Sequence, residues 1–206
     1  KASPGAHLPA AAAVIATVTF VLLFLMTGSV VVPVKALLLN LLSLTAVYGA
    51  MVFVFQEGHL AGVLGFTATG TIDTSMPVLM FCIAFGLSMD YEVFLLSRIK
   101  EEHDRTGDTV AAVAVGLERS GRIVTAAAAL LAIVFAAFAT SRVSFLQLFG
   151  VGTALAVVVD ATLIRALLVP AFMRLAGQAN WWAPAPLRRL HRRVGLRETA
   201  LEPTGP

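Results

Sequence analysis

Residues 76–97 read MPVLMFCIAFGLSMDYEVFLLS, and the only charged side chains in this run are Asp90 and Glu92. A helix of this length is about 33 Å long, because each residue adds about 1.5 Å, so it can cross the hydrocarbon core of a bilayer. Apart from those two carboxylates it is apolar on every face, unlike a surface helix of a soluble domain. A helix also satisfies its own backbone N–H and C=O groups in lipid. The stretch therefore predicts a membrane-spanning helix.

The rest of the chain has the same character. Of its 206 residues, 58% are hydrophobic and 13% are charged, whereas a soluble domain has about 25% charged residues. The mean hydropathy is +0.88. We predict an all-α integral membrane protein with a transmembrane domain over residues 1–178 and a basic cytoplasmic tail over residues 179–206. The five transmembrane helices are expected at residues 9–26, 34–55, 76–97, 123–140 and 145–173.

The segments between these helices differ in composition. Residues 28–33 predict a tight turn, and residues 56–74, rich in Gly and Thr, predict a loop. Residues 98–108 are charged and predict an elbow, followed by an amphipathic helix over 109–122. A short turn over 141–144 reverses the chain. The chain begins at Lys1 without an initiator methionine, so we expect a segment of a longer protein.

Lysine and arginine positions predict the orientation, because cytoplasmic loops carry an excess of these residues. Only Lys1 and Arg142 fall on the outer side. The remaining cations that the sequence assigns to a side fall on the other: Lys35, Arg98, Lys100, Arg105, Arg119, Arg122, Arg174, Arg188, Arg189, Arg192, Arg193 and Arg197. We therefore expect a multi-pass protein of the cell membrane with a cytoplasmic C-terminus. Five spans place the two termini on opposite sides.

Four ionisable side chains lie inside the predicted spans. A charge at the centre of the bilayer costs at least about 2.5 kcal/mol, so such residues usually have a function. Asp90 lies fourteen residues from Met76 and Asp160 fourteen residues from Leu146, near which the two spans enter from outside, so both have a predicted depth of about 21 Å. Arg165 is close enough to extend back toward Asp160 or outward to the cytoplasmic boundary. The fourth residue, Glu92, lies about 200° around the helix from Asp90.

These positions suggest different roles. Asp90 has no cation nearby in its own span, and an apolar environment favours the neutral carboxyl, so Asp90 is our candidate proton carrier. Tyr91 can supply a hydroxyl partner. The Asp160–Arg165 pair has two readings, an ion pair that locks the bundle or a pair that tunes the proton site. We therefore predict a proton relay at Asp90 and Tyr91. Its supporting polar residues are Ser88, Glu92, Asp160 and Arg165.

Three stretches resemble the mycobacterial large membrane protein (MMPL) family. The string FGLSMDYEVFLLSR at residues 85–98, followed by Glu101 and Glu102, closely resembles the family signature. The other two are GLERSGR at 116–122 and the stretch from FGVG at 149–152 through DAT at 160–162 to Pro170. The family is part of the resistance, nodulation and division (RND) superfamily, whose members have two six-helix repeats, each with a large extracytoplasmic domain. This chain resembles the last five helices of the second repeat.

The resemblance implies a function. In the family an Asp-Tyr pair of this helix works with a matching pair of the first repeat, and Asp90 with Tyr91 matches one such pair. Asp160 and Arg165 fall where the family has an embedded acid and base. The implied function is the C-terminal membrane half of an exporter of lipids or other hydrophobic compounds, driven by the proton gradient without another cofactor. Its partners would be the first repeat, the extracytoplasmic domains and membrane lipids, and not nucleic acid.

Other classes of protein fit the sequence less well. The sequence holds no Ser-His-Asp set, zinc-ligand spacing or phosphate loop, so an enzyme is disfavoured, and the single cysteine, Cys82, is expected to have a packing role. The alternative is a non-transporting membrane scaffold or a sensor like the sterol-sensing proteins.

The tail offers a separate site. Residues 187–197 place Leu187, Leu190 and Val194 on one face of a helix, as in a surface helix that binds anionic lipid. A solvated anchor that only sets orientation is the competing interpretation. The arginines of this predicted lipid-surface tail are Arg188, Arg189, Arg192 and Arg193.

Overall fold

The computed structural model describes residues 8–58, 75–141 and 143–194. The predicted loop over 56–74 therefore lies mostly outside the described residues, as do Arg142 and the tail beyond Val194. Helices make up nearly all of the described chain. They are α1 (Leu8–Thr27), α2 (Val31–Met51), η2 (Val52–Gln56), α4 (Ser75–Thr106), α5 (Thr109–Phe138), α6 (Ser144–Val159), η3 (Asp160–Leu168), α7 (Val169–Ala176), η4 (Gly177–Trp181) and α8 (Ala185–Val194).

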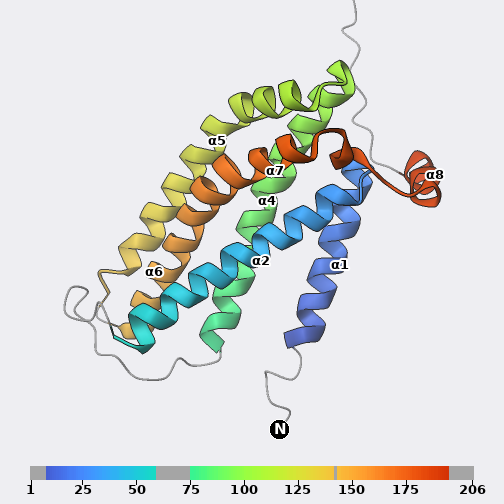
Figure 1. Ribbon diagram of the computed structural model, residues 1–206. Coiled ribbons are helices and arrows are strands. Elements are labelled where there is room, and N and C mark those ends of the chain that lie inside the picture. Colours follow the sequence, from blue (N-terminus) through green and yellow to red (C-terminus); the bar gives the residue numbers. More distant parts are fainter. Residues whose placement is uncertain (1–7, 59–74, 142, 195–206) are drawn as a thin grey trace, which may run out of the picture.

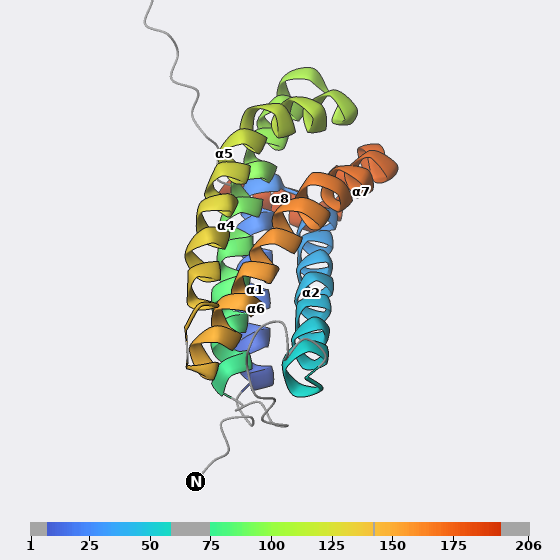
Figure 2. The same cartoon turned by 90° about the vertical axis from the view of Figure 1, so that its left-hand side faces the viewer.

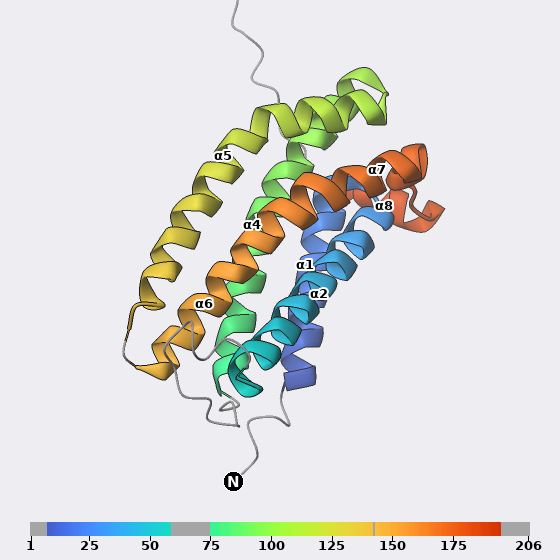
Figure 3. The same ribbon diagram turned by 60° about the vertical axis from the view of Figure 1, so that its left-hand side comes forward.

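Five helical stretches of the described chain are long and apolar enough to cross a membrane, and each overlaps a predicted span. They are Pro9–Thr27, Val31–Gln56, Pro77–Thr106, Thr109–Phe138 and Ser144–Trp181. The last of them is one bent rod of α6, η3 and α7, and it lies between α5 and α2 (Figure 2, Figure 3). The all-α membrane fold is therefore confirmed.

One end of the bundle gathers three connections: the turn from α1 to α2, the turn from α4 to α5, and the segment from η4 to α8 (Figure 1). The first turn is shorter than predicted, because α2 already begins at Val31 and holds Pro33 in its first turn, where proline is tolerated. Gly28 has a φ of +69°, a backbone conformation that favours glycine. An added Cβ there would also lie 2.9 Å from the His191 ring.

The sequence predicts an elbow over residues 98–108, but most of this segment is helical. α4 continues to Thr106, and only Gly107 and Asp108 form the turn. Ion pairs at three- and four-residue spacings, which support a helix, explain this continuation. The pairs are Arg98 with Glu101, Lys100 with Asp104, and Arg105 with Glu102. Asp108 then caps α5 by accepting a hydrogen bond from the Val110 backbone N–H at 2.8 Å.

Close helix contacts hold α5 against its neighbours. A Cβ added at Gly116 would lie 2.5 Å from Cγ1 of Ile99 on α4. One added at Gly150 on α6 would lie 2.5 Å from the Phe135 carbonyl oxygen on α5. Small residues at such positions let helix backbones approach closely, which is how helices pack without a hydrophobic driving force in lipid.

The interior is layered along the bundle axis. Two buried apolar clusters occupy opposite halves, one containing Leu23, Ile99 and Met173, the other Met51 and Met80. Along α2, α4 and the α6–η3 rod, buried polar residues lie at or beside the boundary between the positions that contribute to the two clusters. These polar residues are Asn40, Ser43, Ser88, Glu92, Asp160 and Arg165. The embedded charges predicted from sequence thus share a polar layer, with the exception of Asp90.

Candidate functional site

The centre of the polar layer is an ion pair within η3. The Arg165 Nε donates to Asp160 Oδ2 at 2.8 Å, and Arg165 Nη2 lies 2.7 Å from the same oxygen. In an α-helix, residues five apart point about 140° away from each other. A π-helix bonds residue i to residue i+5, so the π-helical backbone of Asp160–Leu168 aligns the two side chains. Arg165 is 3% exposed, so it extends back toward Asp160 and not to the cytoplasmic boundary.

Ser88 connects this ion pair to α4. Its hydroxyl donates to Asp160 Oδ1 at 2.8 Å, and Arg165 Nη2 donates to the Ser88 carbonyl oxygen. Both oxygens of the Asp160 carboxylate therefore accept hydrogen bonds, and the residue is only 8% exposed. Because Ser88 lies two residues from Asp90, the two aspartates lie at neighbouring levels of the bundle, in agreement with the predicted depths.

Tyr91 faces the same network. The Arg165 guanidinium carbon lies 5.1 Å from the Tyr91 ring centroid, a cation–π distance. Tyr91, Ser88 and Asp160 also line a cavity of about 10 Å³, which is about the volume that one water requires. Within the described chain, no hydrogen bond joins Tyr91 to Asp90, so the structure does not bring the predicted hydroxyl partner to that carboxyl.

Glu92 extends the network toward the end of the bundle that holds α8. Its side chain is 5% exposed and interacts electrostatically with Arg165, Asp160 and Lys35. Lys35 donates in turn to Oδ1 of Asn180, which is fully buried. Sequence reasoning identified Glu92 but not the Lys35–Asn180 link. The two residues are 145 positions apart, and no short motif signals such a contact.

Asp90 has different surroundings, because it is exposed on the opposite side of α4 from Glu92. At three-, four- and seven-residue spacings, its face of the helix also carries Ile83, Gly86, Val93 and Ser97, all exposed or half-buried. A Cβ added at Gly86 would meet no atom within 4 Å. The other described helices therefore leave this face open, and we call it the Asp90 face.

Cys82 lies beside the Asp90 face and is exposed as well. The sequence predicts that Cys82 packs against other helices, but among the described helices it is exposed.

The predicted tail helix forms as α8. Leu190 is 49% exposed and Val194 57% exposed, and the four arginines are exposed too. His191 fastens α8 to α1, because its Nε2 hydrogen-bonds to the Leu25 carbonyl oxygen at 3.0 Å.

A helical bundle with five candidate spans and a buried ionic layer between apolar clusters defines a multi-pass membrane protein with charges embedded in the bilayer. The chain belongs to the MMPL family, because the family model matches residues 5–200. The resemblance seen in the sequence is therefore confirmed.

Relatives with assigned names agree with the family. The chain is 53% identical over 195 residues to a putative membrane protein of Streptomyces coelicolor, covering 95% of this chain and 28% of the relative. It is 41% identical over 198 residues to the trehalose monomycolate exporter MmpL3 of Mycobacterium tuberculosis, covering 95% and 21%. It is 44% identical over 170 residues to the heme uptake protein MmpL11 of the same organism, covering 82% and 18%. The chain thus spans less than a third of the length of these relatives.

Proposed function

We propose that this chain is the second transmembrane half of a proton-driven exporter of lipids or other hydrophobic compounds, and that it supplies one half of an intramembrane proton relay. The observation that carries the proposal is the exposure of Asp90 in the middle of an apolar span. The proton-carrying group is the Asp90 carboxyl, with Tyr91 beside it.

The cost of an exposed carboxyl supports a partner on the Asp90 face. A carboxylate that faces lipid costs about 2.5 kcal/mol or more, so intramembrane acids almost always face protein or a water-filled cavity. Gly86 and Ser97 give the Asp90 face small side chains, which allow another helix to approach closely. In a two-repeat transporter the first repeat would cover this face and bring its own Asp-Tyr pair to Asp90.

The buried ionic layer would transmit the effect of protonation. Protonation of Asp90 would remove a charge from the contact between the two transmembrane repeats. The loss of this charge would shift the equilibrium between two positions of α4. α4 is tied to η3 through Ser88, so a displacement of α4 would also displace the α6–α7 rod. In this mechanism Asp160 and Arg165 couple helices and carry no proton themselves.

The names of two relatives support the class of cargo. One is an exporter of trehalose monomycolate and the other a heme uptake protein, and both names denote transport of a largely hydrophobic molecule. Export is proposed from the first of these, which the chain matches over 95% of its length. The cargo-binding parts would lie in the rest of the longer protein.

We also propose that the end of the bundle bearing α8 is cytoplasmic. That end collects the charged part of α4 and the arginines of α8. In intact cells, cysteines replacing Gln56 or Glu57 should react with a membrane-impermeant maleimide, whereas cysteines replacing Asp104 or Arg105 should react only after permeabilisation. The reverse pattern would overturn this orientation.

The relay is tested by Asp90→Asn in the full-length transporter. Asparagine keeps the size of a protonated aspartate but never ionises, so export should stop while insertion and stability persist. Asp104→Asn, a change of the same kind at an exposed carboxyl of α4 near its end, is the control and should export normally. If Asp90→Asn exported at the normal rate with the normal dependence on the proton gradient, Asp90 would not be the carrier. That result would favour the scaffold or sensor interpretation.

A further inference from the structure

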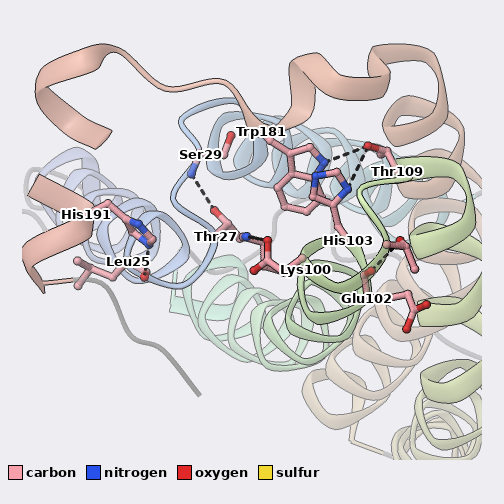
Figure 4. A network of polar contacts seen from close by, with 11 residues as sticks. Leu25, Thr27, Ser29, Lys100, Glu102, His103, Thr109, Trp181 and His191 are labelled. Carbon is pink, nitrogen blue, oxygen red and sulfur yellow. Dashed lines mark hydrogen bonds and ion pairs between the residues drawn. The ribbon is translucent and has the colours of Figure 1, made fainter. Parts of the chain in front are cut away.

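A cavity of about 560 Å³ opens at the end of the bundle where α8 packs on α1. Three separate segments form its walls: the turn after α1, the end of α4, and the stretch from Trp181 through α8 (Figure 4). The proposed relay uses none of the residues that line it. The lining residues that matter for its chemistry are Lys100, His103, Trp181, Arg188, Arg189 and Arg192.

Aromatic contacts fix the wall that α4 provides. The His103 and Trp181 rings stack with centroids 4.3 Å apart and planes only 12° from parallel. The Trp181 indole N–H donates to the Thr109 hydroxyl at 3.1 Å, as Figure 4 shows. The Lys100 ammonium lies 5.3 Å from the Trp181 ring centroid. The far end of α4 is thereby joined to the segment that leads into α8.

His191 fixes the opposite wall. Besides its hydrogen bond to the Leu25 carbonyl oxygen, its ring packs edge-on against Phe24 with centroids 5.9 Å apart. Gly28 allows this approach because it has no side chain to meet the ring. The arginines of α8 are therefore held over the cavity by a docked helix and not by a freely moving tail.

The cavity carries excess positive charge. Within the described chain, the guanidinium groups of Arg188, Arg189 and Arg192 have no ion-pair or hydrogen-bond partner. Lys100 pairs with Asp104, the acidic residue of the lining. At the same end of the molecule, Arg98 and Arg105 are both neutralised by neighbouring glutamates. Unpaired guanidinium groups thus gather where there is room for an anionic ligand.

We propose that this cavity binds the phosphate headgroup of an anionic membrane lipid. Guanidinium groups bind phosphate oxygens through paired, charge-assisted hydrogen bonds, and three of them line the cavity. The cavity reaches Thr27, the last residue of the first span, so it lies where a span ends and headgroups begin. Val18, Val21 and Leu22 on the preceding turns of α1 are exposed and apolar, so lipid would surround the helix just below its end at Thr27. A cavity at that end is therefore closer to lipid headgroups than to bulk phosphate.

The test uses the full-length transporter in neutral detergent, with lipid binding measured by native mass spectrometry. The ligands are dioctanoyl phosphatidylglycerol, dioctanoyl phosphatidylcholine and inorganic phosphate. We expect the phosphatidylglycerol to bind more tightly than the other two. Arg188→Gln and Arg192→Gln should each weaken its binding about fivefold. Arg193→Gln is the matched control, because Arg193 belongs to the same predicted lipid-surface tail but does not line the cavity, and it should weaken the binding clearly less than the other two variants do.

A second variant tests the shape of the site independently of its charge. His191→Ala keeps every arginine but removes the contacts that dock α8 on α1, so it should also weaken phosphatidylglycerol binding. The thermal unfolding midpoint of each variant serves as the check on folding. Equal losses in Arg193→Gln and Arg192→Gln, or full affinity in His191→Ala, would mean that α8 binds lipid only as a diffuse basic surface. Displacement of the lipid by equimolar inorganic phosphate would reassign the cavity to free phosphate. Each of these results would overturn the proposal.

Discussion

Asp90 on α4 and Asp160 on η3 lie at neighbouring levels of the bundle, yet their surroundings are opposite. Asp160 is 8% exposed, and both of its carboxylate oxygens accept hydrogen bonds, one from Ser88 and one from Arg165. Asp90 is exposed on a face that the other described helices leave open. One carboxylate is thus neutralised within the chain, and the other lies on a face that none of the described helices covers.

The difference separates two faces of α4, one whose acidic partner is compensated inside the bundle and one whose acid is exposed. Inside the bundle the Asp160 carboxylate is compensated by Arg165 and Ser88, although Arg165 Nη1 has no hydrogen-bond partner among the described residues, so removing either charge of the pair would be costly. An exposed acid in an apolar span gains from a partner and, once covered, can bind and release a proton. The two faces of α4 therefore fit the proposed division, in which one face holds this bundle together and the other contacts the first repeat of the proposed transporter.

The largest effect is expected from breaking the buried ion pair between Asp160 and Arg165. Arg165→Met in the full-length protein leaves the Asp160 carboxylate buried without its cation, which should destabilise the protein by about 3–5 kcal/mol. The double variant Asp160→Asn with Arg165→Met removes both charges and should recover most of that loss. Thermal unfolding in detergent measures both effects. Equal destabilisation by the single and double variants would show that the pair is not what holds α4 and η3 together.

A smaller effect is expected from Tyr91→Phe. The phenylalanine keeps the ring that packs against Arg165, so the stability should stay close to that of the parent protein. Within the described chain the Tyr91 hydroxyl does not hydrogen-bond to Asp90, but in the proposed relay it would do so while Asp90 is ionised, and a bond to a charged group contributes about 1.5 kcal/mol or more. Transport should therefore slow by about tenfold. Normal transport combined with reduced stability would mean that Tyr91 contributes only to the packing of the polar layer.

Much of the fold could be predicted from hydropathy and charge. The five spans follow from apolar runs long enough to cross a bilayer, and the opposite directions of Asp90 and Glu92 follow from the 100° step of a helix. The nearness of Arg165 to Asp160 was also expected, but its cause was not. A π-helix depends on how the rod packs between α5 and α2, and no residue of η3 signals it alone.

Contacts between distant parts of the chain could not be predicted in the same way. The Lys35–Asn180 bond and the His103–Trp181 stack each join the end of one span to the segment before α8. They form only once five helices bring those ends together. The charged residues 98–108 predict an elbow, but α4 continues through them to Thr106. The ion pairs on one side of that helix show why it continues.

The central claim, that Asp90 carries the proton while Asp160 stays ion-paired, is tested most directly by chemical labelling. Dicyclohexylcarbodiimide enters apolar regions and reacts with protonated carboxyl groups. In membranes containing the full-length transporter, peptide mass spectrometry should find Asp90 modified, and less so as the pH is raised. Asp160 should remain unmodified unless Arg165 is replaced by methionine. Modification of Asp160 in the parent protein, with Asp90 unmodified at every pH, would contradict the account.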